Sequence, residues 1–231
     1  MAEKTKVLVT AGNTAMPIDQ VRSITNIFRG RTGTAIASYF AMQGAEVTLL
    51  TSNLGLVVEM GREDIRVISY KTFDSLACKM ESAIATEERP DIVIHSAAVS
   101  DFKVAGVFTK DNNDRLVSVD ATKKVSSSYP ELFLKMVQTE KLVDLIRPNW
   151  GFNGVLVKFK LEVGISDEEL QEIARKSRKS SDADLIVANC LEWANSYAYI
   201  IGSDDEAVHV SRKLLPKMLF EKIEDIRRER Q

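Results

Sequence analysis

Cysteine, histidine and net charge are all scarce in this sequence of 231 residues. The two cysteines, Cys78 and Cys190, lie far apart, so neither a disulfide framework nor a cysteine-based zinc site follows from them. Two histidines, His95 and His209, are too few for a histidine-dominated metal site, and any metal ligands stay unknown. A net charge of −2 argues against a general nucleic-acid binder, because such proteins usually carry a basic excess.

Long apolar runs are also absent. No run reaches membrane-spanning length, and the first residues lead into a strand pattern instead of the apolar core of a signal peptide. We therefore expect a cytoplasmic protein that binds neither membrane nor nucleic acid. The sequence shows no internal repeat and no linker, so we predict a single domain over residues 1–231.

Short apolar segments alternate with amphipathic ones along the chain. The segments that predict strands are residues 7–10, 46–50, 65–68, 91–94, 155–157 and 185–188, and those that predict helices are residues 33–43, 75–85, 132–146, 167–180 and 213–229. A polar stretch from about 102 to 128 predicts an excursion, either a hairpin or a flap, and residues 199–210 predict a hairpin. Together these features predict an α/β fold: a Rossmann-like, doubly wound, mostly parallel sheet with a flap excursion and a C-terminal hairpin and helix.

Glycines follow the first predicted strand and precede the first predicted helix. In a doubly wound sheet, ligands bind where parallel strands end, and glycine lets a backbone approach a ligand closely. Gly12, Gly30 and Gly33 are spaced unlike either GxGxxG or the phosphate loop of nucleoside triphosphatases. A ligand-binding turn and a tight turn with a long surface insertion fit this pattern equally well.

Polar side chains gather between these glycines and after the fourth strand. Arg22 lies in a segment with two further arginines, which fits anion binding at a helix N-terminus or a solvated cluster. Asn26 offers both a donor and an acceptor. After the strand at 91–94, Ala97 and Ala98 leave room for a ligand, and Asp101 is either a site residue or a turn cap. His95 fits a hydrogen-bonding core residue better than a base.

Three further segments carry residues suited to a nucleotide. Lys124, in a lysine pair at the end of the polar stretch, can neutralise charge on a phosphate oxygen or lie in solvent. Phe159 can stack on a base while Lys160 reaches phosphates, or both can belong to an ordinary edge strand. Asn189 ends a strand, where it reads the edge of a base or makes a turn.

Taken in order, these segments resemble the phosphopantothenoylcysteine synthetases. The matching pieces are TAGNTAMPID, VRSITNIFRGRTG, HSAAVSDF, KKVSSS, VKFKLE, ARKSRKSSDADLIVAN and GSDDEAV, which extend over nearly the whole chain. The form resembled is free-standing, so we expect no flavin-dependent decarboxylase domain and no FMN. The resemblance implies a ligase of coenzyme A biosynthesis and a homodimer.

The reaction implied by this resemblance has two steps. The carboxylate of 4'-phosphopantothenate attacks the α-phosphate of ATP or CTP, and pyrophosphate leaves. The amine of cysteine then attacks the acyl-nucleotidyl intermediate, and the nucleoside monophosphate leaves. Both steps gather negative charge, so the resemblance implies Mg²⁺ and positioned lysines, without a protein nucleophile.

The resemblance also implies roles for single residues. The implied nucleotide contacts are Gly12, Gly30, Gly33, Phe159, Lys160 and Asn189, the implied substrate contacts are Arg22, Asn26, Ala97, Ala98 and Asp101, and the implied catalytic residues are Asn26 and Lys124. Asn26 would hold the acyl-nucleotidyl group, and Lys124 would act as a charge clamp when the flap closes. Arg22 would reach the substrate phosphate from the neighbouring subunit.

Several positions depart from the family's pattern. Asn13 replaces a second glycine, Met16 stands near a position that is often acidic, and residues 27–29 replace a serine-rich stretch. Lys141 replaces an aspartate near the motif that helps to select cytosine, which favours ATP. Two alternatives follow: a non-catalytic nucleotide-binding module, or a short-chain reductase. The reductase lacks support, because no tyrosine here has a lysine four positions later.

Overall fold

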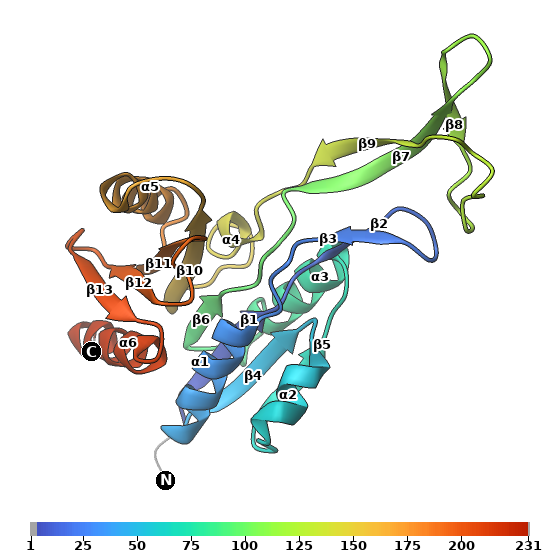
Figure 1. The fold of residues 1–231 in the computed structure, drawn as a ribbon. Helices are drawn as coiled ribbons and strands as arrows, with labels where there is room; N and C mark the ends of the chain where they lie inside the picture. The colour runs from blue at the N-terminus through green and yellow to red at the C-terminus, as the bar shows by residue number, and fades with distance from the viewer. Residues whose placement is uncertain (1–3, 231) are drawn as a thin grey trace.

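The chain is built around a sheet of eight strands, as a computed structural model of residues 4–230 shows (Figure 1). In spatial order the strands are β13 (Ala207–Ser211), β12 (Tyr197–Ile201), β11 (Leu185–Cys190), β10 (Val155–Glu162), β6 (Ile92–His95), β1 (Lys6–Ala11), β4 (Glu46–Thr51) and β5 (Arg66–Ser69). Neighbours from β5 to β11 pair in parallel, and β12 and β13 pair antiparallel. The predicted mostly parallel, doubly wound α/β fold is confirmed.

The order of the strands places a topological switch point between β1 and β6. From β1 the chain builds β4 and β5 on one side, then returns to β6 and continues outward through β10 and β11. Loops that leave β1 and β6 therefore diverge at the carboxyl edge of the sheet. This is the edge at which open α/β sheets bind ligands, so the site should lie there.

Helices cover both faces of the sheet. They are α1 (Arg31–Met42), α2 (Leu54–Met60), α3 (Phe73–Ile84), α4 (Leu142–Leu145), α5 (Asp167–Ser180) and α6 (Leu215–Glu229). Apolar residues of α1 and α6 share a buried cluster with one set of strand residues, whereas α3 and α4 share a second cluster with the alternate set. Successive strand residues point to opposite faces, so residues from one strand divide between the two layers.

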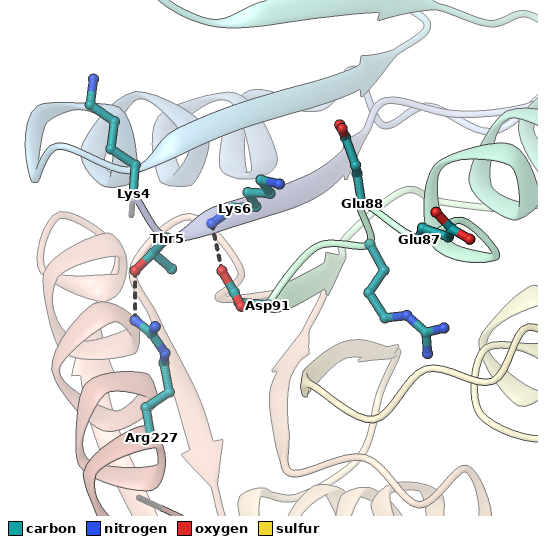
Figure 2. A pocket seen from close by; sticks show the side chains of 8 residues that line it. Lys4, Thr5, Lys6, Glu87, Glu88, Asp91 and Arg227 are labelled. Carbon is teal, nitrogen blue, oxygen red and sulfur yellow. Dashed lines mark hydrogen bonds between the residues drawn. The ribbon is translucent and has the colours of Figure 1, made fainter. Parts of the chain in front are cut away.

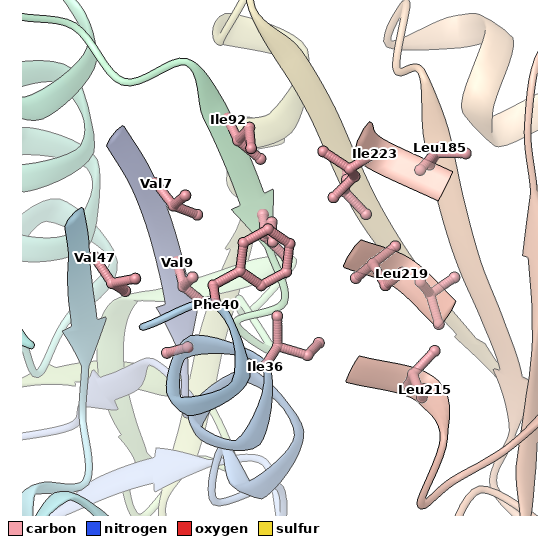
Figure 3. Packing of buried hydrophobic residues seen from close by; sticks show 14 of the residues in the cluster. Val7, Val9, Ile36, Phe40, Val47, Ile92, Leu185, Leu215, Leu219 and Ile223 are labelled. Atoms are coloured by element: carbon pink, nitrogen blue, oxygen red, sulfur yellow. The ribbon is translucent and has the colours of Figure 1, made fainter. Parts of the chain in front are cut away.

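The first of these clusters joins the two ends of the chain. Figure 3 shows Phe40 of α1 between Val9 of β1 and the inward side chains of α6, including Leu219 and Ile223. All four of these side chains are fully buried. Burying a side chain of this size contributes about 1.5–3 kcal/mol. This layer therefore holds α1 firmly on the face of the sheet, with its first turn near the carboxyl edge.

An antiparallel arm leaves the main sheet after β6. It comprises residues 102–138, with β7 (Phe102–Lys110), β8 (Leu116–Val119) and β9 (Phe133–Gln138) in the order β8-β7-β9. A short hairpin of β2 (Ala15–Pro17) and β3 (Ser23–Thr25) lies beneath the arm (Figure 1). The excursion predicted for residues 102–128, a hairpin or a flap, contains the β7–β8 hairpin, and β9 extends this hairpin to a sheet of three strands.

The predicted helix at residues 132–146 is wrong. Residues Phe133–Gln138 form β9 and pair antiparallel with β7, and only the short α4 follows. The apolar residues of this segment suit either structure, and hydrogen bonding to a distant strand decides between them. The hairpin β2–β3 and the helix α2 were not predicted, whereas the C-terminal hairpin and α6 are confirmed.

The prediction of a single domain over residues 1–231 stays a prediction, and residues 1–3 and 231 lie outside the described part. Within residues 4–230, no helix combines the length and the apolar character that crossing a membrane requires.

Candidate functional site

Two glycines bring three loops into contact at the carboxyl end of β1. Gly30 has φ 89° and Gly12 has φ 96°, values that favour glycine. A Cβ on Gly30 would lie 2.4 Å from the backbone nitrogen of Gly12, and a Cβ on Gly12 would lie 2.2 Å from Ser52 Oγ. The loops after β1, before α1 and after β4 therefore meet where side chains cannot fit.

The third predicted glycine lets α1 begin against the sheet. A Cβ on Gly33 would lie 2.7 Å from the Cβ of Ala11 and 2.4 Å from Ser96 Oγ. Gly30 is the N-cap of α1 without a side-chain cap, and the first turn contains no acidic residue. The first N–H groups of this helix and its positive dipole end are thus available to an anion.

Asn26 connects the loop before α1 to the loop after β6. Its Nδ2 donates to the carbonyl of Ala98 at 2.7 Å, and its Oδ1 accepts from the backbone of Phe28 at 3.2 Å. Asn13 donates in turn to the carbonyl of Asn26 at 2.8 Å. The side-chain amides of Asn13 and Asn26 therefore hold together the loop after β1, the loop before α1 and the loop after β6. Asn13 takes part although it replaces the family's glycine.

The loop after β6 forms the other wall of this region, which we call the crevice (Gly12, Gly30, Gly33, Asn26 and residues 96–100). Ala97 donates its backbone N–H to Thr10 Oγ1 at 3.1 Å, and Ala98 donates to the carbonyl of Gly12 at 2.8 Å. Asp101 comes next and is exposed at the base of the arm. Ala97 and Ala98 thus lie in the crevice, and Asp101 lies at its rim.

A row of three polar residues lies buried beside the crevice on β1, β6 and β10. Thr10 and Lys158 both stand in register with His95, and Thr10 Oγ1 lies 2.9 Å from His95 Nδ1. Burial, and then the charge of Lys158, lower the pKa of His95 to about 4. His95 is therefore a neutral, hydrogen-bonded core residue, as predicted from the sequence.

Lys158 itself is an unusual core residue. Its Nζ donates to the carbonyl of Ser177 and to Ser181 Oγ, both at 2.8 Å, at the end of α5. Burial lowers the pKa of Lys158 to about 8. The contacts satisfy a helix C-terminus, so we read Lys158 as a structural cation of the sheet body.

The predicted residues on β10 and β11 divide between the two faces of the sheet. Phe159 packs with the α1 and α6 cluster, and Asn189 is in register with Leu161 and so lies on the same face. Lys160 points to the opposite face and pairs with Glu162 at 2.9 Å. Phe159 and Asn189 therefore share a face with α1, whereas Lys160 does not.

Arg22 and Lys124 lie farther out, on the hairpin and the arm. Arg22 Nη2 donates to the carbonyl of Val125 at 2.5 Å, which places the arginine beside the loop of Lys124. Lys124 is exposed in the segment between β8 and β9. The structure thus brings these two residues together on the arm side of the crevice.

Ser52 and Arg212 were missed in the sequence. Ser52 Oγ accepts from the backbone of Asn13 at 2.9 Å and belongs to a polar run that ends β4, a signal that could have been noticed. Arg212 donates to Thr32 in the first turn of α1, and its Nη1 is buried without a hydrogen-bond partner among the described residues. That contact depends on the packing of α6 against α1 in the folded chain.

One hollow lies away from the crevice. It measures about 330 Å³ and is lined by residues at the amino ends of β1 and β6, including Lys6 and Asp91 (Figure 2). The backbone of Lys6 donates to Asp91 Oδ2 at 2.8 Å, and Arg227 donates to Thr5 Oγ1 at 2.9 Å. Because this hollow lies at the amino edge of the sheet, opposite to the edge at which doubly wound sheets bind ligands, we assign the site to the crevice instead.

No group of three or more histidine, cysteine, aspartate or glutamate residues among residues 4–230 is arranged to hold a metal ion.

Known proteins resemble this chain over most of its length. A sequence profile of the DNA/pantothenate metabolism flavoprotein C-terminal domain matches residues 2–217. The coenzyme A biosynthesis bifunctional protein CoaBC of Thermococcus kodakarensis is 35% identical over 220 residues, which cover 94% of this chain and 48% of that protein. The protein of the same name from Escherichia coli (strain K12) is 29% identical over 205 residues, 88% of this chain and 45% of that protein.

A solved structure is similar in fold as well. The crystal structure of the DNA/pantothenate metabolism flavoprotein from Streptococcus pneumoniae has a TM-score of 0.80 and 28% identity, and the match covers 96% of this chain and 99% of that one. The chain spans about half the length of the curated relatives it matches.

Proposed function

We propose that this chain, which belongs to the family of the DNA/pantothenate metabolism flavoprotein C-terminal domain, is a ligase that joins cysteine to 4'-phosphopantothenate. The acid's carboxylate displaces pyrophosphate from a nucleoside triphosphate, and the amine of cysteine then displaces the nucleoside monophosphate from the acyl group. The relatives named as coenzyme A biosynthesis proteins support this reaction.

The observation that carries the proposal is the construction of the crevice. The uncapped N-terminus of α1 lies at the switch point of the sheet, and Gly12, Gly30 and Gly33 keep side chains out of it. This arrangement suits a phosphate group, which the helix dipole and free backbone N–H groups stabilise. The small residues Ala97 and Ala98 on the opposite wall leave room for the acid that attacks it.

In this proposal the residues act mainly by positioning and by balancing charge. Asn26, oriented by Ala98 and Phe28, holds the acyl-nucleotidyl group, and Lys124 approaches the phosphates from the arm. Phe159 and Asn189 contact the nucleotide from the α1 face, whereas Lys160 must leave Glu162 to reach a phosphate. Mg²⁺ arrives with the nucleotide, and Asp101 meets the substrate at the rim.

We further propose ATP as the nucleotide and no bound FMN. Lys141, which replaces an aspartate of cytosine-selecting relatives, is the N-cap residue of α4 and has no side-chain capping bond. The cytoplasmic location expected from the sequence stays a prediction.

The arm supports a homodimer. Its small sheet leaves large apolar side chains in solvent, namely Phe102, Leu116, Val117, Tyr129 and Met136. A second copy of the chain that covers this surface would also supply the neighbouring subunit that Arg22 needs, because the family resemblance has Arg22 reach the substrate phosphate from the neighbouring subunit. Sedimentation of the native protein should give twice the chain mass, and Leu116→Lys with Val117→Lys should give the single-chain mass.

The direct test of the ligase is release of pyrophosphate by the purified protein. With 4'-phosphopantothenate, Mg²⁺, cysteine and ATP or CTP, we expect turnover that requires the acid and continues only when cysteine is present. A folded protein that binds nucleotide but releases no pyrophosphate with either one would contradict the proposal. It would favour the non-catalytic nucleotide-binding module instead.

A further inference from the structure

The tip of the β2–β3 hairpin carries a carboxylate that is almost entirely buried. Asp19 is 7% exposed although its neighbours Gln20 and Val21 are in solvent. Its Oδ1 accepts from the backbone N–H groups of Val21 at 2.8 Å and Arg22 at 2.7 Å. These bonds close the turn, and one carboxylate oxygen is sufficient for them.

The other oxygen of Asp19 reaches the arm. Oδ2 accepts from the backbone N–H of Val125 at 3.0 Å, while Arg22 donates to the carbonyl of the same residue. Arg22 Nε also lies 3.4 Å from Asp19 Oδ2. The bond from Val125, followed by that from Val21, lowers the pKa of Asp19. Asp19 and Arg22 therefore hold both polar backbone groups of Val125.

Val125 is also the anchored residue of its segment. Its side chain is 1% exposed and packs with Val107 and Val119 of the arm, and Ile18 of the hairpin joins the same cluster. The residues on either side, Lys124 and Ser126, are exposed. The loop is thus fixed at one residue, through its N–H, its carbonyl and its side chain, directly beside Lys124.

The hairpin that makes this attachment also leads into the crevice. The strand β3 begins at Ser23, directly after the turn that Asp19 closes, and it ends just before Asn26, whose amide donates to the carbonyl of Ala98. Thr25 Oγ1 donates to the carbonyl of Thr14 at 3.2 Å and ties the base of the hairpin together. One short hairpin thus connects the wall of the crevice to the segment that bears Lys124.

We propose that Asp19 is a positioning residue that sets where Lys124 stands relative to the crevice. Asp19 touches no substrate in this proposal, and it acts through Val125. The effect on turnover rests on the proposed ligase function, whereas the effect on the loop does not.

The test uses two variants of Asp19 and a matched control. Asp19→Asn replaces an acceptor by a donor, and Asp19→Ser keeps a short acceptor for the turn but cannot reach Val125. The control is Asp111→Asn, because Asp111 Oδ1 accepts two backbone bonds, from Asn113 and Arg115, in the β7–β8 turn far along the arm. Both Asp19 variants should lower kcat by roughly tenfold or more with little change in KM, and the control should not.

Coupling to Lys124 distinguishes positioning from a general loss of structure. In a Lys124→Gln background, Asp19→Asn should have little further effect on kcat, because the group it positions is already gone. If kcat of the double variant fell by the product of the two single-variant losses, the two residues would act independently and the proposal would be overturned.

Hydrogen exchange separates this proposal from the ligase function. Asp19→Asn and Asp19→Ser should speed exchange of the Val125 amide at least tenfold, and trypsin should cut after Lys124 faster, while the thermal midpoint stays close to that of the native protein. Unchanged exchange in both variants would overturn the proposal even if turnover fell. Faster exchange in a protein without ligase turnover would support the positioning of the loop and refute the proposed function alone.

Discussion

The sheet body and the arm hold their proposed site residues in place by different kinds of contact. In the body, Gly12, Gly30 and Gly33 are fixed by backbone packing so close that one added carbon collides. In the arm, the loop of Lys124 depends on the Asp19 and Arg22 contacts to Val125 and on a small apolar cluster. The backbone around the proposed nucleotide site is therefore fixed by close packing, whereas the exposed charge of Lys124 lies on a segment that is anchored mainly at Val125.

This difference has a physical reason. Phosphate binding by backbone N–H groups needs fixed positions, because the helix dipole acts only over a short range. Stabilisation of a charge that develops during the reaction needs a group that can approach and withdraw with the substrates. The comparison predicts that substitutions in the arm lower turnover and leave the free energy of unfolding unchanged. Substitutions in the body should instead lower the free energy of unfolding.

Among the changes in the arm, Lys124→Gln has the largest expected effect on turnover. Removing one donor that stabilises developing charge should lower kcat by about 10²–10³-fold, while the free energy of unfolding stays the same because Lys124 is exposed. Pyrophosphate release and urea unfolding measure the two quantities. Lys123→Gln is the control, and an equal loss in that variant would remove Lys124 from its assigned role.

Gly30→Ala tests the rigid region. The left-handed backbone and the collision with Gly12 should together lower the free energy of unfolding by about 2–4 kcal/mol and abolish nucleotide binding. Gly44 has the same φ of 89° and nothing within 4 Å of its added Cβ, so Gly44→Ala should lose only about 1 kcal/mol. Urea unfolding of both variants measures the difference, and equal losses would mean that close approach contributes nothing.

Lys158→Met tests the buried cation of the body. Because the folded pKa of about 8 lies below the unfolded value, the charged lysine is disfavoured in the fold, and native stability rises with pH from about 8 towards 10.5. At pH 7 the variant should therefore be at least as stable as the native protein, with a gain of at most about 2 kcal/mol. The gain should shrink as pH rises past 8, and a gain independent of pH would contradict the lowered pKa.

Asn26→Asp tests the contact between the loop before α1 and the loop after β6. A carboxylate cannot donate to the carbonyl of Ala98, so the local contact is lost, at a cost of about 1–2 kcal/mol, and an anion stands beside the phosphate site. Nucleotide affinity should fall more than stability, as calorimetric titration and urea unfolding would show. Full affinity in this variant would place the anion site elsewhere.

Much of the body could be predicted from the sequence because its signals are local. Continuous apolar strands such as residues 7–10 indicate a sheet buried on both faces, and that alone locates the ligand edge near Gly12. The alternation of side chains along β10 also explains why Phe159 and Lys160 face opposite ways, a consequence that the sequence contains but that we did not use.

The arm could not be predicted in the same way because its structure depends on distant partners. Residues 132–146 resembled a helix until pairing with β7 made the first part a strand. Asp19 stands in an ordinary turn, and nothing nearby indicates its bond to Val125, 106 residues later. Nor could the approach of Arg212 to Thr32 be inferred, because it depends on the packing of α6 against α1.

The most direct measurement of the central claim is mass spectrometry of a quenched reaction that contains 4'-phosphopantothenate and nucleotide but no cysteine. The proposal predicts an adduct with the mass of 4'-phosphopantothenate joined to a nucleoside monophosphate, which disappears when cysteine is added as phosphopantothenoylcysteine forms. Formation of pyrophosphate without such an adduct, or no reaction by folded protein, would contradict it.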